Sequence, residues 1–350
     1  TQIVLPNKII LMSYNNETMK ILFIADGRSP IALNWLSYFH GSPHEVHLTS
    51  TFPVDPGLQE LLGLQSLHVI PVAFSGAKQG GGKAAAAEGG GLKQRLKRLV
   101  WGAGLVGARM AVRQWLGPLT LPRAARRLGA VIAQVQPDLV HALRIPYEGM
   151  LAALALADQP AVPLLISVWG NDFTLHAASN PWMGWLTRRS MRWATALHTD
   201  CAADQARALT WGFQAGKPSI VLPGNGGIDL ALFHPANQTA VSLQVINPRG
   251  VRAYVRNDTF FQAIPRVLKE LPEARFVCLG MQGEALAERW LAELGTAAQV
   301  ALLPKLPREQ VAAVFQASAV AISPTTHDGT PNTLLEAMAC GCFPIVGDIL

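Results

Sequence analysis

Short apolar runs alternate along most of the chain with stretches in which apolar residues recur at helical spacing. Residues 20–25, KILFIA, form the first apolar run, and Ile31, Trp35 and Phe39 follow on one face of an expected helix. An apolar run of about four to eight residues between turn residues is typical of a buried strand, whereas the wider spacing is typical of a helix. This alternation predicts βαβ units and parallel sheets, as in a doubly wound α/β protein.

The same patterns predict the other elements. Further strands are expected at 46–49, 67–71, 137–141, 164–168, 196–199, 219–223, 244–247, 275–279, 300–303, 319–323 and 343–346. Helices are expected at 58–64, 92–116, 148–157, 260–271, 284–294 and 308–316, and from residue 202 to just before Gly212.

The run GNGGIDLALFHP, beginning at Gly224, interrupts the alternation with turn residues. A chain of 350 residues is long enough for two domains, each with its own core. We therefore expect a first domain at 19–227 and a second at 228–350. Residues 1–18 lack the features of a signal peptide. They are expected to be a disordered extension, or the product of a start codon placed too early.

Composition excludes a disordered chain, since 50% of the residues are hydrophobic and 15% are charged. The four cysteines lack the spacing of metal ligands, and we expect them to be small core residues in a reducing cytoplasm. The net charge of +6 is modest, but it is unevenly distributed.

A basic, glycine-rich insertion is expected at 75–127. From Lys78 to Arg127 there are eleven basic residues, and only Glu88 opposes them. The uncharged stretch 99–108 is too short for a membrane span, which needs about 20 residues. The segment suits a helix lying on an anionic lipid surface, or equally a solvated basic helix packed on the domain. Nucleic acid is a weaker alternative, because no binding motif accompanies the charge.

Residues 319–348 are expected to form a strand, a loop, a helix and a second strand. Thr330 is placed as the N-cap, Pro331 as the first helical residue and Gly341 as the C-terminal glycine. The first N–H groups, those of Asn332, Thr333 and Leu334, lack partners inside such a helix. With the helix dipole they favour an anion.

Two carboxylates bracket this helix start. Asp328 lies in the preceding loop, and Glu336 lies on the helix within the apolar sequence LLEAMA, where a carboxylate needs a partner. A phosphate site between two carboxylates suits a nucleotide-activated sugar, whose hydroxyls they can bind. The alternative is an ordinary βαβ crossover with solvated acids.

The loop after residues 244–247 carries three arginines, Arg249, Arg252 and Arg256, whose guanidinium groups suit a diphosphate. No Asp-x-Asp pair occurs in the chain, and neither a Walker loop nor a GxGxxG after the first strand is present. We therefore expect arginines and a helix end, with no metal ion, to neutralise the phosphates.

Three loops at expected strand ends carry candidate residues of the first domain. The DGRSP turn holds Gly27 and Arg28, His141 ends another strand, and WGND ends a third with Asp172. Carboxyl ends of strands are where open α/β sheets bind ligands. For Arg28 a surface arginine on a tight turn is equally plausible, and for His141 a core histidine. The alternative for Asp172 is a cap of the following helix.

The 319–348 stretch resembles the donor-site signature of retaining GT-B glycosyltransferases of family 4, in which two glutamates are separated by seven residues. Glu336 matches the second glutamate, the family's ribose ligand. Asp328 takes the place of the first, which contacts the donor sugar, and this departure shortens the side chain by one methylene. The resemblance implies that Arg249, and Arg256 in place of a lysine, bind the donor phosphates. The implied donor site comprises Arg249, Arg256, Asp328, Gly329, Thr330, Asn332, Thr333, Leu334 and Glu336.

WGND is similar to the Gly-x-Asp element on the acceptor side of this family's cleft, and GNGGID to its interdomain linker. The resemblance makes Asp172 and Asp328 the candidate catalytic residues. The acceptor-side candidates that it implies are Gly27, Arg28, Ser29, His141, Trp169 and Asn171.

The family fold consists of two Rossmann-like domains facing each other across a cleft. The resemblance implies retaining transfer from a nucleotide-diphosphate sugar, without cofactor or metal, to a glycan or lipid-linked acceptor. The leaving diphosphate can itself take the acceptor proton. The alternatives are a non-catalytic nucleotide-sugar-binding protein, which Asp328 favours, and a sugar-nucleotide epimerase, which needs no acceptor.

We expect a cytoplasmic protein, either free or at the inner face of the membrane. Family members continue with further helices after the strand at 343–346, so the C-terminal domain is expected to be incomplete here. Either the natural chain is longer, or this form is destabilised.

Overall fold

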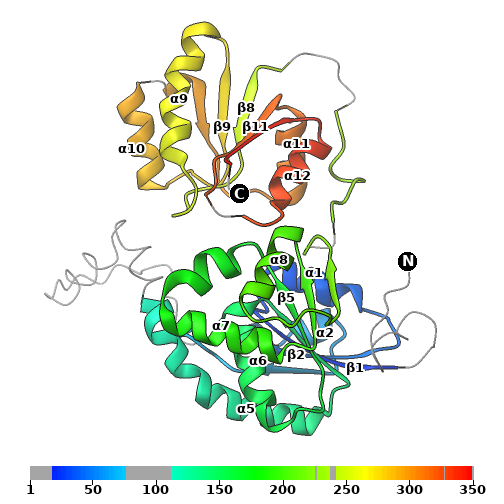
Figure 1. Cartoon of the computed structure of the whole chain (residues 1–350). Helices are drawn as coiled ribbons and strands as arrows, with labels where there is room; N and C mark the ends of the chain where they lie inside the picture. Colours follow the sequence, from blue (N-terminus) through cyan, green and yellow to red (C-terminus); the bar gives the residue numbers. More distant parts are fainter. Residues whose placement is uncertain are drawn as a thin grey trace, which may run out of the picture. The chain divides into compact units, whose positions relative to one another are not determined.

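A computed structural model describes residues 18–75, 112–224, 227–236, 242–295, 297–326 and 328–348. The chain separates into two compact units, one ending at Gly226 and the other beginning at Gly227 (Figure 1). Each unit is an α/β sandwich around a parallel sheet, and each is considered by itself below.

In the described part of the first unit, seven parallel strands pair in the order β3-β2-β1-β4-β5-β6-β7. Sequential strands leave β1 in one direction, and the chain then crosses to β4 on its other side. The strands are β1 (Lys20–Ala25), β2 (Glu45–Ser50), β3 (Ser66–Val69), β4 (Leu139–Leu143), β5 (Leu164–Val168), β6 (Ala196–Thr199) and β7 (Ser219–Val221).

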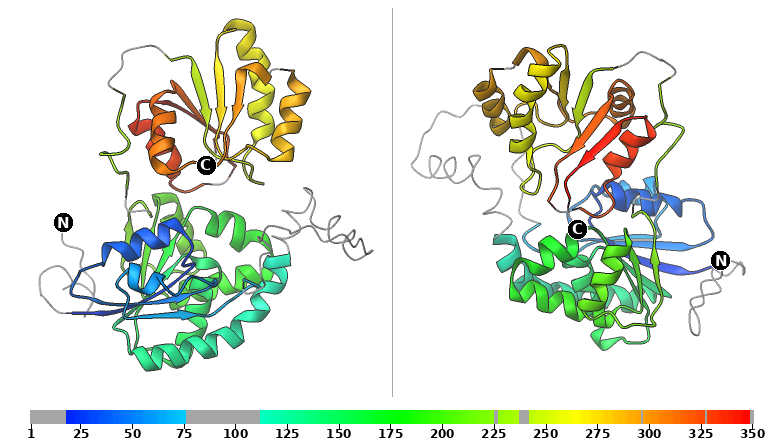
Figure 2. Two further views of the ribbon diagram at one scale, coloured as in Figure 1. Left: turned by 180° about the vertical axis from the view of Figure 1, so that it is seen from behind. Right: turned by 45° about the horizontal axis from the view of Figure 1, so that its top comes forward.

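Helices cover both faces of this sheet, as the two further views in Figure 2 show. Side chains of β1 alternate between the faces, so that Leu22 and Ile24 join one core cluster and Ile21 and Phe23 join the other. The helices are α1 (Pro30–Tyr38), α2 (Leu58–Leu61), α5 (Leu121–Val135), α6 (Met150–Ala155), α7 (Pro181–Trp193) and α8 (Ala202–Thr210). Shorter turns are η2 (Gly117–Thr120), η3 (Ile145–Gly149), η4 (Leu156–Asp158), η5 (Asp172–His176) and η6 (Ala177–Ser179).

In the described part of the second unit, five parallel strands pair in the order β10-β9-β8-β11-β12. The strands are β8 (Gln244–Asn247), β9 (Arg275–Cys278), β10 (Val300–Leu302), β11 (Val320–Ser323) and β12 (Phe343–Val346). The helices are α9 (Asn257–Glu270), α10 (Ala285–Leu294), η7 (Ala297–Gln299), α11 (Arg308–Gln316) and α12 (Asn332–Ala339). Phe261 and Phe315 are among its fully buried side chains.

The structure confirms the α/β class and corrects several expected boundaries. The helix expected at 148–157 begins only at Met150, because Tyr147 has a φ of 70° and breaks the helical path before it. The helix expected from 260 begins at Asn257. Two helices, α5 and α7, were not predicted at all, the first because residues up to 127 had been assigned to the basic insertion.

Much of that insertion, residues 76–111, lies outside the described residues, as do residues 1–17 of the N-terminal extension. Of the helix predicted at 92–116, only 112–116 can be compared, and these residues are helical. Arg123, Arg126 and Arg127 lie on α5 and are exposed, so this part of the basic segment belongs to a regular helix of the first unit.

Candidate functional site

Two loops meet in the second unit where β8 and β11 lie side by side. The chain runs from β8 to one side of the sheet and returns through β11 on the other, which makes this pair the topological switch point. Arg256 N donates to Pro324 O at 2.7 Å, and Thr326 N donates to Tyr254 O at 2.9 Å. The loop after β8 and the loop after β11 therefore form one wall, at the edge where such sheets bind ligands.

Arg249 joins these loops to the start of α12. Its Nη2 atom lies 2.7 Å from Asp328 Oδ2, and its Nη1 atom donates to Thr333 Oγ1 at 3.1 Å. The residue is only 8% exposed, and its Nε atom has no hydrogen-bond partner among the described residues. Gly250 follows with a φ of 65°, a left-handed conformation that favours glycine and turns the loop back. Three predicted donor-site residues are thus in direct contact.

The start of α12 differs by one residue from the prediction. Pro331, with a φ of −78° and a ψ of 90°, is the N-cap, and the helix begins at Asn332, so the assignment of Thr330 as N-cap was wrong. The N–H groups of Leu334 and Leu335 both donate to Pro331 O, because the extended Pro331 still turns its carbonyl along the helix. Gly341, with a φ of 92°, follows the helix as expected.

Other predicted donor residues line the same turn. Gly329 N donates to Asp328 Oδ1 at 3.2 Å, which closes the loop before the helix. The Oδ1 atom of Asn332 is buried and lacks a partner within the described part of the chain. Unpaired buried polar atoms are uncommon in folded proteins, and two of them here, on Arg249 and Asn332, flank the helix start.

Glu336 has a partner that the sequence did not suggest. Its side chain is 13% exposed, and Oε1 lies 3.6 Å from Nη2 of Arg308 on α11. Burial raises the pKa of this carboxyl above its ordinary value, and the Arg308 charge opposes that shift. Glu336 therefore satisfies the expectation that a carboxylate in this apolar stretch needs a partner.

Arg256 is not hydrogen-bonded to Asp328 or Thr333, the partners of Arg249. Its Nε and Nη2 atoms donate to the carboxylate of Asp258 at 2.9 and 2.8 Å, and its side chain is 57% exposed. A bidentate pair of this kind satisfies the guanidinium locally. Its assignment as a phosphate ligand stays a prediction.

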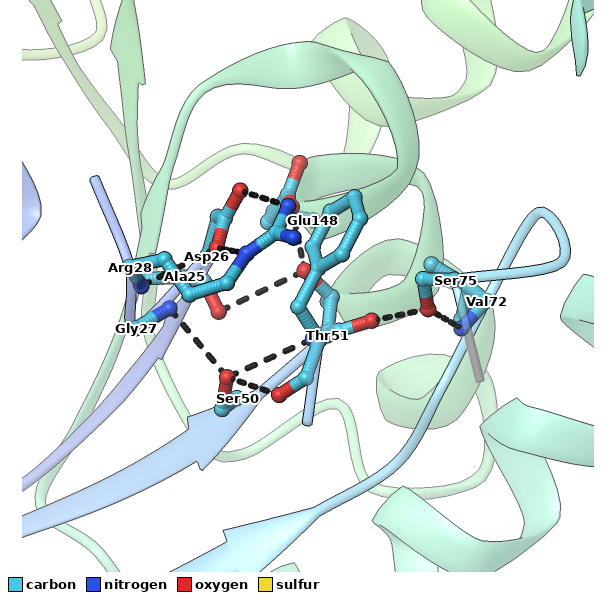
Figure 3. Close-up of polar contacts among 10 residues, drawn as sticks. Ala25, Asp26, Gly27, Arg28, Ser50, Thr51, Val72, Ser75 and Glu148 are labelled. Carbon is cyan, nitrogen blue, oxygen red and sulfur yellow. Dashed lines mark hydrogen bonds and ion pairs between the residues drawn. The ribbon is translucent and has the colours of Figure 1, made fainter. Parts of the chain in front are cut away.

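The corresponding switch point of the first unit lies between β1 and β4. Gly27 N donates to Ser50 Oγ at 3.1 Å (Figure 3). A Cβ atom on Gly27 would lie 2.9 Å from Val54 Cγ1. Arg28 pairs with Asp26 at 3.0 Å and lies over the ring of Phe52, 3.6 Å from its centroid. Ser29 is the N-cap of α1. Arg28 is an exposed arginine of this turn, and its contacts with Asp26 and Phe52 hold its guanidinium in place.

Asp172 is fully buried and accepts three donors. Arg144 Nη2 and Ile145 N lie 2.9 Å from its carboxylate, and Trp169 N lies 3.3 Å away. Burial raises the pKa of Asp172, while the Arg144 charge opposes that rise. The alternative role of Asp172, as a cap of the following helix, is not seen: η5 has Asn171 at its N-cap, with no side-chain capping bond. Asp172 instead holds Arg144.

His141 lies in the hydrophobic core of the first unit. It is 2% exposed, its Nε2 atom lies 2.9 Å from Ser167 Oγ, and its ring packs against Phe23 and Trp35. Burial lowers the pKa of His141 from 6.5 to about 3, so the ring is neutral near pH 7. These contacts favour the core-histidine alternative over a role in binding.

Comparison with known protein families identifies the family and the fold of this chain. A glycosyl transferase 4-like domain matches residues 39–224, more than half of the chain, and a glycosyl transferases group 1 domain matches residues 251–349. The chain belongs to the glycosyl transferase 4-like family. Its two α/β units are those of the GT-B fold.

A curated relative of this chain is also a glycosyltransferase. A D-inositol 3-phosphate glycosyltransferase of Mycobacterium leprae is 31% identical over 154 residues, which are 41% of this chain and 36% of that relative. The matched segment thus spans little more than a third of that relative.

Solved structures share the fold at lower identity. Sucrose-phosphate synthase from Thermosynechococcus elongatus is 15% identical with a TM-score of 0.65, and the match covers 94% of this chain and 81% of the other. HepE of Anabaena, in complex with UDP, is 14% identical with a TM-score of 0.61 over 94% and 80% of the two chains.

Four residues near Arg28 and Arg144 were not predicted as site residues of this glycosyltransferase-family chain, namely Thr51, Arg113, Glu148 and His176. Glu148 is 2% exposed and accepts a hydrogen bond from Thr51 Oγ1 at 2.6 Å (Figure 3). Burial raises the pKa of Glu148 from 4.5 to about 7. Arg113 and His176 line the same cavity as Glu148. A lone glutamate before the apolar run MLAALALA was the available signal for Glu148.

The described residues contain no group of three or more His, Cys, Asp or Glu side chains that could hold a metal ion. Within those same ranges, no helix is long and apolar enough to cross a membrane.

Proposed function

We propose that this protein transfers a sugar from a nucleoside-diphosphate sugar to an acceptor hydroxyl. The observation that carries the proposal is the contact of Arg249 with Asp328 and Thr333. It places a buried guanidinium beside the start of α12, and both groups favour phosphate oxygens. Membership of the glycosyl transferase 4-like family and the UDP complex of HepE support the same assignment.

The donor roles that we propose combine these contacts with the resemblance to the family's donor site. Arg249 and the first N–H groups of α12, from Asn332 to Leu334, would bind the diphosphate, with Gly329 and Thr330 shaping the turn. Glu336 would accept the ribose hydroxyls. Asp328 would hold Arg249 in place and face the donor sugar. We propose that the developing charge on the diphosphate is stabilised by Arg249 and the helix dipole, without a metal ion and with retention of configuration.

The acceptor role falls to the first unit. Asp172 is enclosed by Arg144, Ile145 and Trp169, so we propose that it acts by positioning Arg144 and does not itself touch the acceptor. The acceptor class that the resemblance implies is a glycan or a lipid-linked sugar, and the glycosyltransferase named above supports a hydroxylated acceptor.

We further propose that the protein works at the inner face of a membrane. Trp115, Leu119, Trp182 and Trp185 are all between 41% and 57% exposed. Asn180 Nδ2 donates to Gln114 O at 3.2 Å, which joins the segment that carries Trp115 to the start of α7. Exposed tryptophans beside arginines suit the boundary between lipid head groups and acyl chains. Of the eleven basic residues between 78 and 127, the structure describes Arg113, Arg123, Arg126 and Arg127, and the other seven lie outside the described residues.

The proposal is tested by measuring nucleoside-diphosphate release from UDP- and GDP-sugars. The wild type is expected to release UDP or GDP from one donor, and to do so equally in EDTA. Glu336→Gln should lower kcat/KM by about 10- to 100-fold, since the loss of a hydrogen bond to a charged group amounts to about 1.5–3 kcal/mol. Arg308→Gln, which removes only the protein partner of Glu336, should have a smaller effect.

The other outcomes distinguish the alternatives. Tight nucleotide binding without release of UDP or GDP would indicate a binding protein. An epimerised donor in the absence of any acceptor would indicate an epimerase. Loss of the rate in EDTA, restored by a divalent cation, would contradict the metal-independent mechanism.

A further inference from the structure

A cavity of about 370 Å³ opens in the first unit at the carboxyl ends of its strands. Its walls come from the loop after β1, the end of β2, the helical residues 112–116, the turn η3 and the end of η5. Its lining combines the apolar residues Phe52 and Pro146 with the polar side chains of Asp26, Arg28, Arg113, Arg144, Glu148 and His176.

Three guanidinium groups face this cavity, and two of them are already paired. Arg28 is bound to Asp26 and Arg144 to Asp172. Arg113 takes part in no ion pair among residues 18–75 and 112–224, and its buried Nε atom has no hydrogen-bond partner there. Its guanidinium instead lies 4.7 Å from the ring centroid of Tyr147 and 5.0 Å from that of Phe52. The rings orient this charge without neutralising it.

The carboxyl groups nearby do not compensate Arg113. Asp172 is occupied by Arg144 and two backbone N–H groups. Glu148 lies in the cavity wall with Thr51 Oγ1 2.6 Å from it, and burial raises its pKa to about 7 (Figure 3). Near neutral pH it therefore carries only part of a negative charge. His176 is neutral, because burial lowers its pKa to about 3, and its Nδ1 atom has no partner among the described residues.

Backbone strain is concentrated in the segment that presents these side chains. Arg144 has a φ of 112° and Tyr147 a φ of 70°, conformations that are strained for a bulky residue. The bond from Ile145 N to Asp172 and the bond from Tyr147 Oη to Arg113 O hold this segment in place. A strained segment that is held by buried bonds keeps Arg144, Tyr147 and Glu148 at fixed positions around the cavity.

We propose that this cavity binds the anionic group of an acidic acceptor, a sugar acid or sugar phosphate, with Arg113 as its principal partner and Arg144 beside it. The inference rests on the proposed function, since it concerns the acceptor of the same reaction. One guanidinium without a carboxylate partner, an adjacent paired guanidinium and a neutral imidazole form a set of donors for oxyanions. The cavity volume falls in the range of small-molecule sites, about 300–1,000 Å³.

Proton uptake by Glu148 should accompany binding. A bound anion next to Glu148 disfavours its ionised form, so the affinity for an anion of fixed charge should fall as the pH rises from 6 to 8. The other charged or titratable groups that line the cavity with Glu148 are Asp26, Arg28, Arg113, Arg144, Tyr147 and His176. Of these, the charges of Arg144 and Arg113 act on Glu148 by favouring its ionised form.

Three matched probes test the inference by calorimetry on the full chain. Glucose is neutral, glucuronate carries a carboxylate and glucose 6-phosphate carries a phosphate. We expect at least one of the two anionic probes to bind tenfold or more tightly than glucose. Tighter binding of glucuronate would identify the anionic group as a carboxylate, and tighter binding of glucose 6-phosphate would identify it as a phosphate. Arg113→Gln should remove this preference, whereas Arg123→Gln, the same change on an exposed residue of α5, should keep it.

Glucuronate affinity measured at pH 6, 7 and 8 gives a second readout. The wild type should lose affinity over this range by up to about tenfold per pH unit, and Glu148→Gln should show no such loss. Arg249→Gln, which affects only the proposed donor site, should leave all three probes unchanged and thereby separates this inference from the proposed function. Equal affinity for all probes, no measurable binding of either anion, or a preference that survives in Arg113→Gln would overturn the inference.

Discussion

Arg249 shows how a single buried charge shapes the site of the second unit. A guanidinium that is 8% exposed needs a partner, and Asp328 lies 2.7 Å from its Nη2 atom. Burial lowers the pKa of Arg249, and the Asp328 charge opposes that shift. Asp328 therefore has a structural role, because it pairs directly with this buried arginine.

Arg249→Gln should selectively weaken the binding of diphosphates. We expect the affinity for UDP or GDP to fall by about 1–3 kcal/mol, because a charge-assisted hydrogen bond to phosphate is lost. The affinity for uridine or guanosine should hardly change. Calorimetry with each nucleotide and nucleoside measures both effects and names the donor base.

Arg256→Gln is the matched control for this measurement. Arg256 is exposed and paired with Asp258, so its replacement should have a smaller effect than that of Arg249. If both variants lost the same affinity for UDP or GDP, Arg256 would be a phosphate ligand, as the sequence predicted. Unchanged nucleotide binding in Arg249→Gln would contradict the site.

At the scale of elements, three neighbouring strands share a buried chain of hydrogen bonds. His141 on β4, Ser167 on β5 and His198 on β6 are linked by two contacts of 2.9 Å, and His198 Nε2 donates to Leu222 O at 2.9 Å. This last bond requires Nδ1 of His198 to accept from the Ser167 hydroxyl. Ser167 in turn accepts from His141, so the chain is satisfied while both rings are neutral.

The neutral His141 should make stability sensitive to acid. Its pKa is about 3 in the folded protein and about 6.5 when unfolded, so the unfolded chain binds the extra proton between these values. The free energy of unfolding should therefore fall as the pH drops below 6.5, by up to about 1.4 kcal/mol per pH unit from this residue. Urea unfolding at pH 7, 6 and 5 measures the slope.

His141→Gln provides the comparison, because an amide can still donate to Ser167 but does not titrate. His176, with a lowered pKa, and Glu148, with a raised one, contribute to the slope of both proteins. Only the difference between wild type and variant reports on His141. Identical slopes would show that this histidine is not held neutral by the fold.

At the scale of the whole molecule, both units carry charged residues at the switch point of their parallel sheet. Each parallel sheet has one switch point, at β1 and β4 in the first unit and at β8 and β11 in the second. The cluster of Arg28 and Arg144, which we propose serves the acceptor, lies at the first, and the cluster of Arg249 and Asp328, which we propose serves the donor, lies at the second. Loops diverge there, which leaves space for a ligand at the strand ends.

Membrane association can be tested on exposed residues of the described structure. We expect the protein to co-sediment with anionic vesicles at low salt, and less at high salt, because the surface charges are then screened. Replacing Arg123, Arg126 and Arg127 by Gln should weaken binding by about fivefold per residue in contact, the equivalent of about 1 kcal/mol each.

Trp182→Ser combined with Trp185→Ser should weaken the same binding by removing apolar contacts with lipid. Tyr38→Ser is a suitable control, since Tyr38 is 81% exposed but lies on α1. If the amount of co-sedimented protein did not change with salt, with lipid charge or with any of these substitutions, the membrane proposal would be contradicted.

The order and type of most elements could be predicted because they depend on local patterns. Strands β5, β6, β8 and β12 and helix α11 match the expected residues, since short apolar runs and turn residues are properties of neighbouring positions. The α12 stretch likewise revealed its helix and the carboxylates beside it. The miss of α7 has a tertiary cause: Trp182 and Trp185 are exposed, so its apolar residues do not mark one buried face.

Tertiary structure alone decided which charges meet. Arg249 and Asp328 are 79 residues apart, and Thr51 and Glu148 are 97 residues apart, so no local pattern could pair them. The strand order of each sheet brings these positions together and also sets their burial. Burial in turn raises the pKa of Glu148 and keeps His141 neutral, because the loss of solvent disfavours the charged form of either group. The sequence by itself determined the family and most of the elements, whereas the partners and the charge states of the candidate site residues depend on contacts between distant segments.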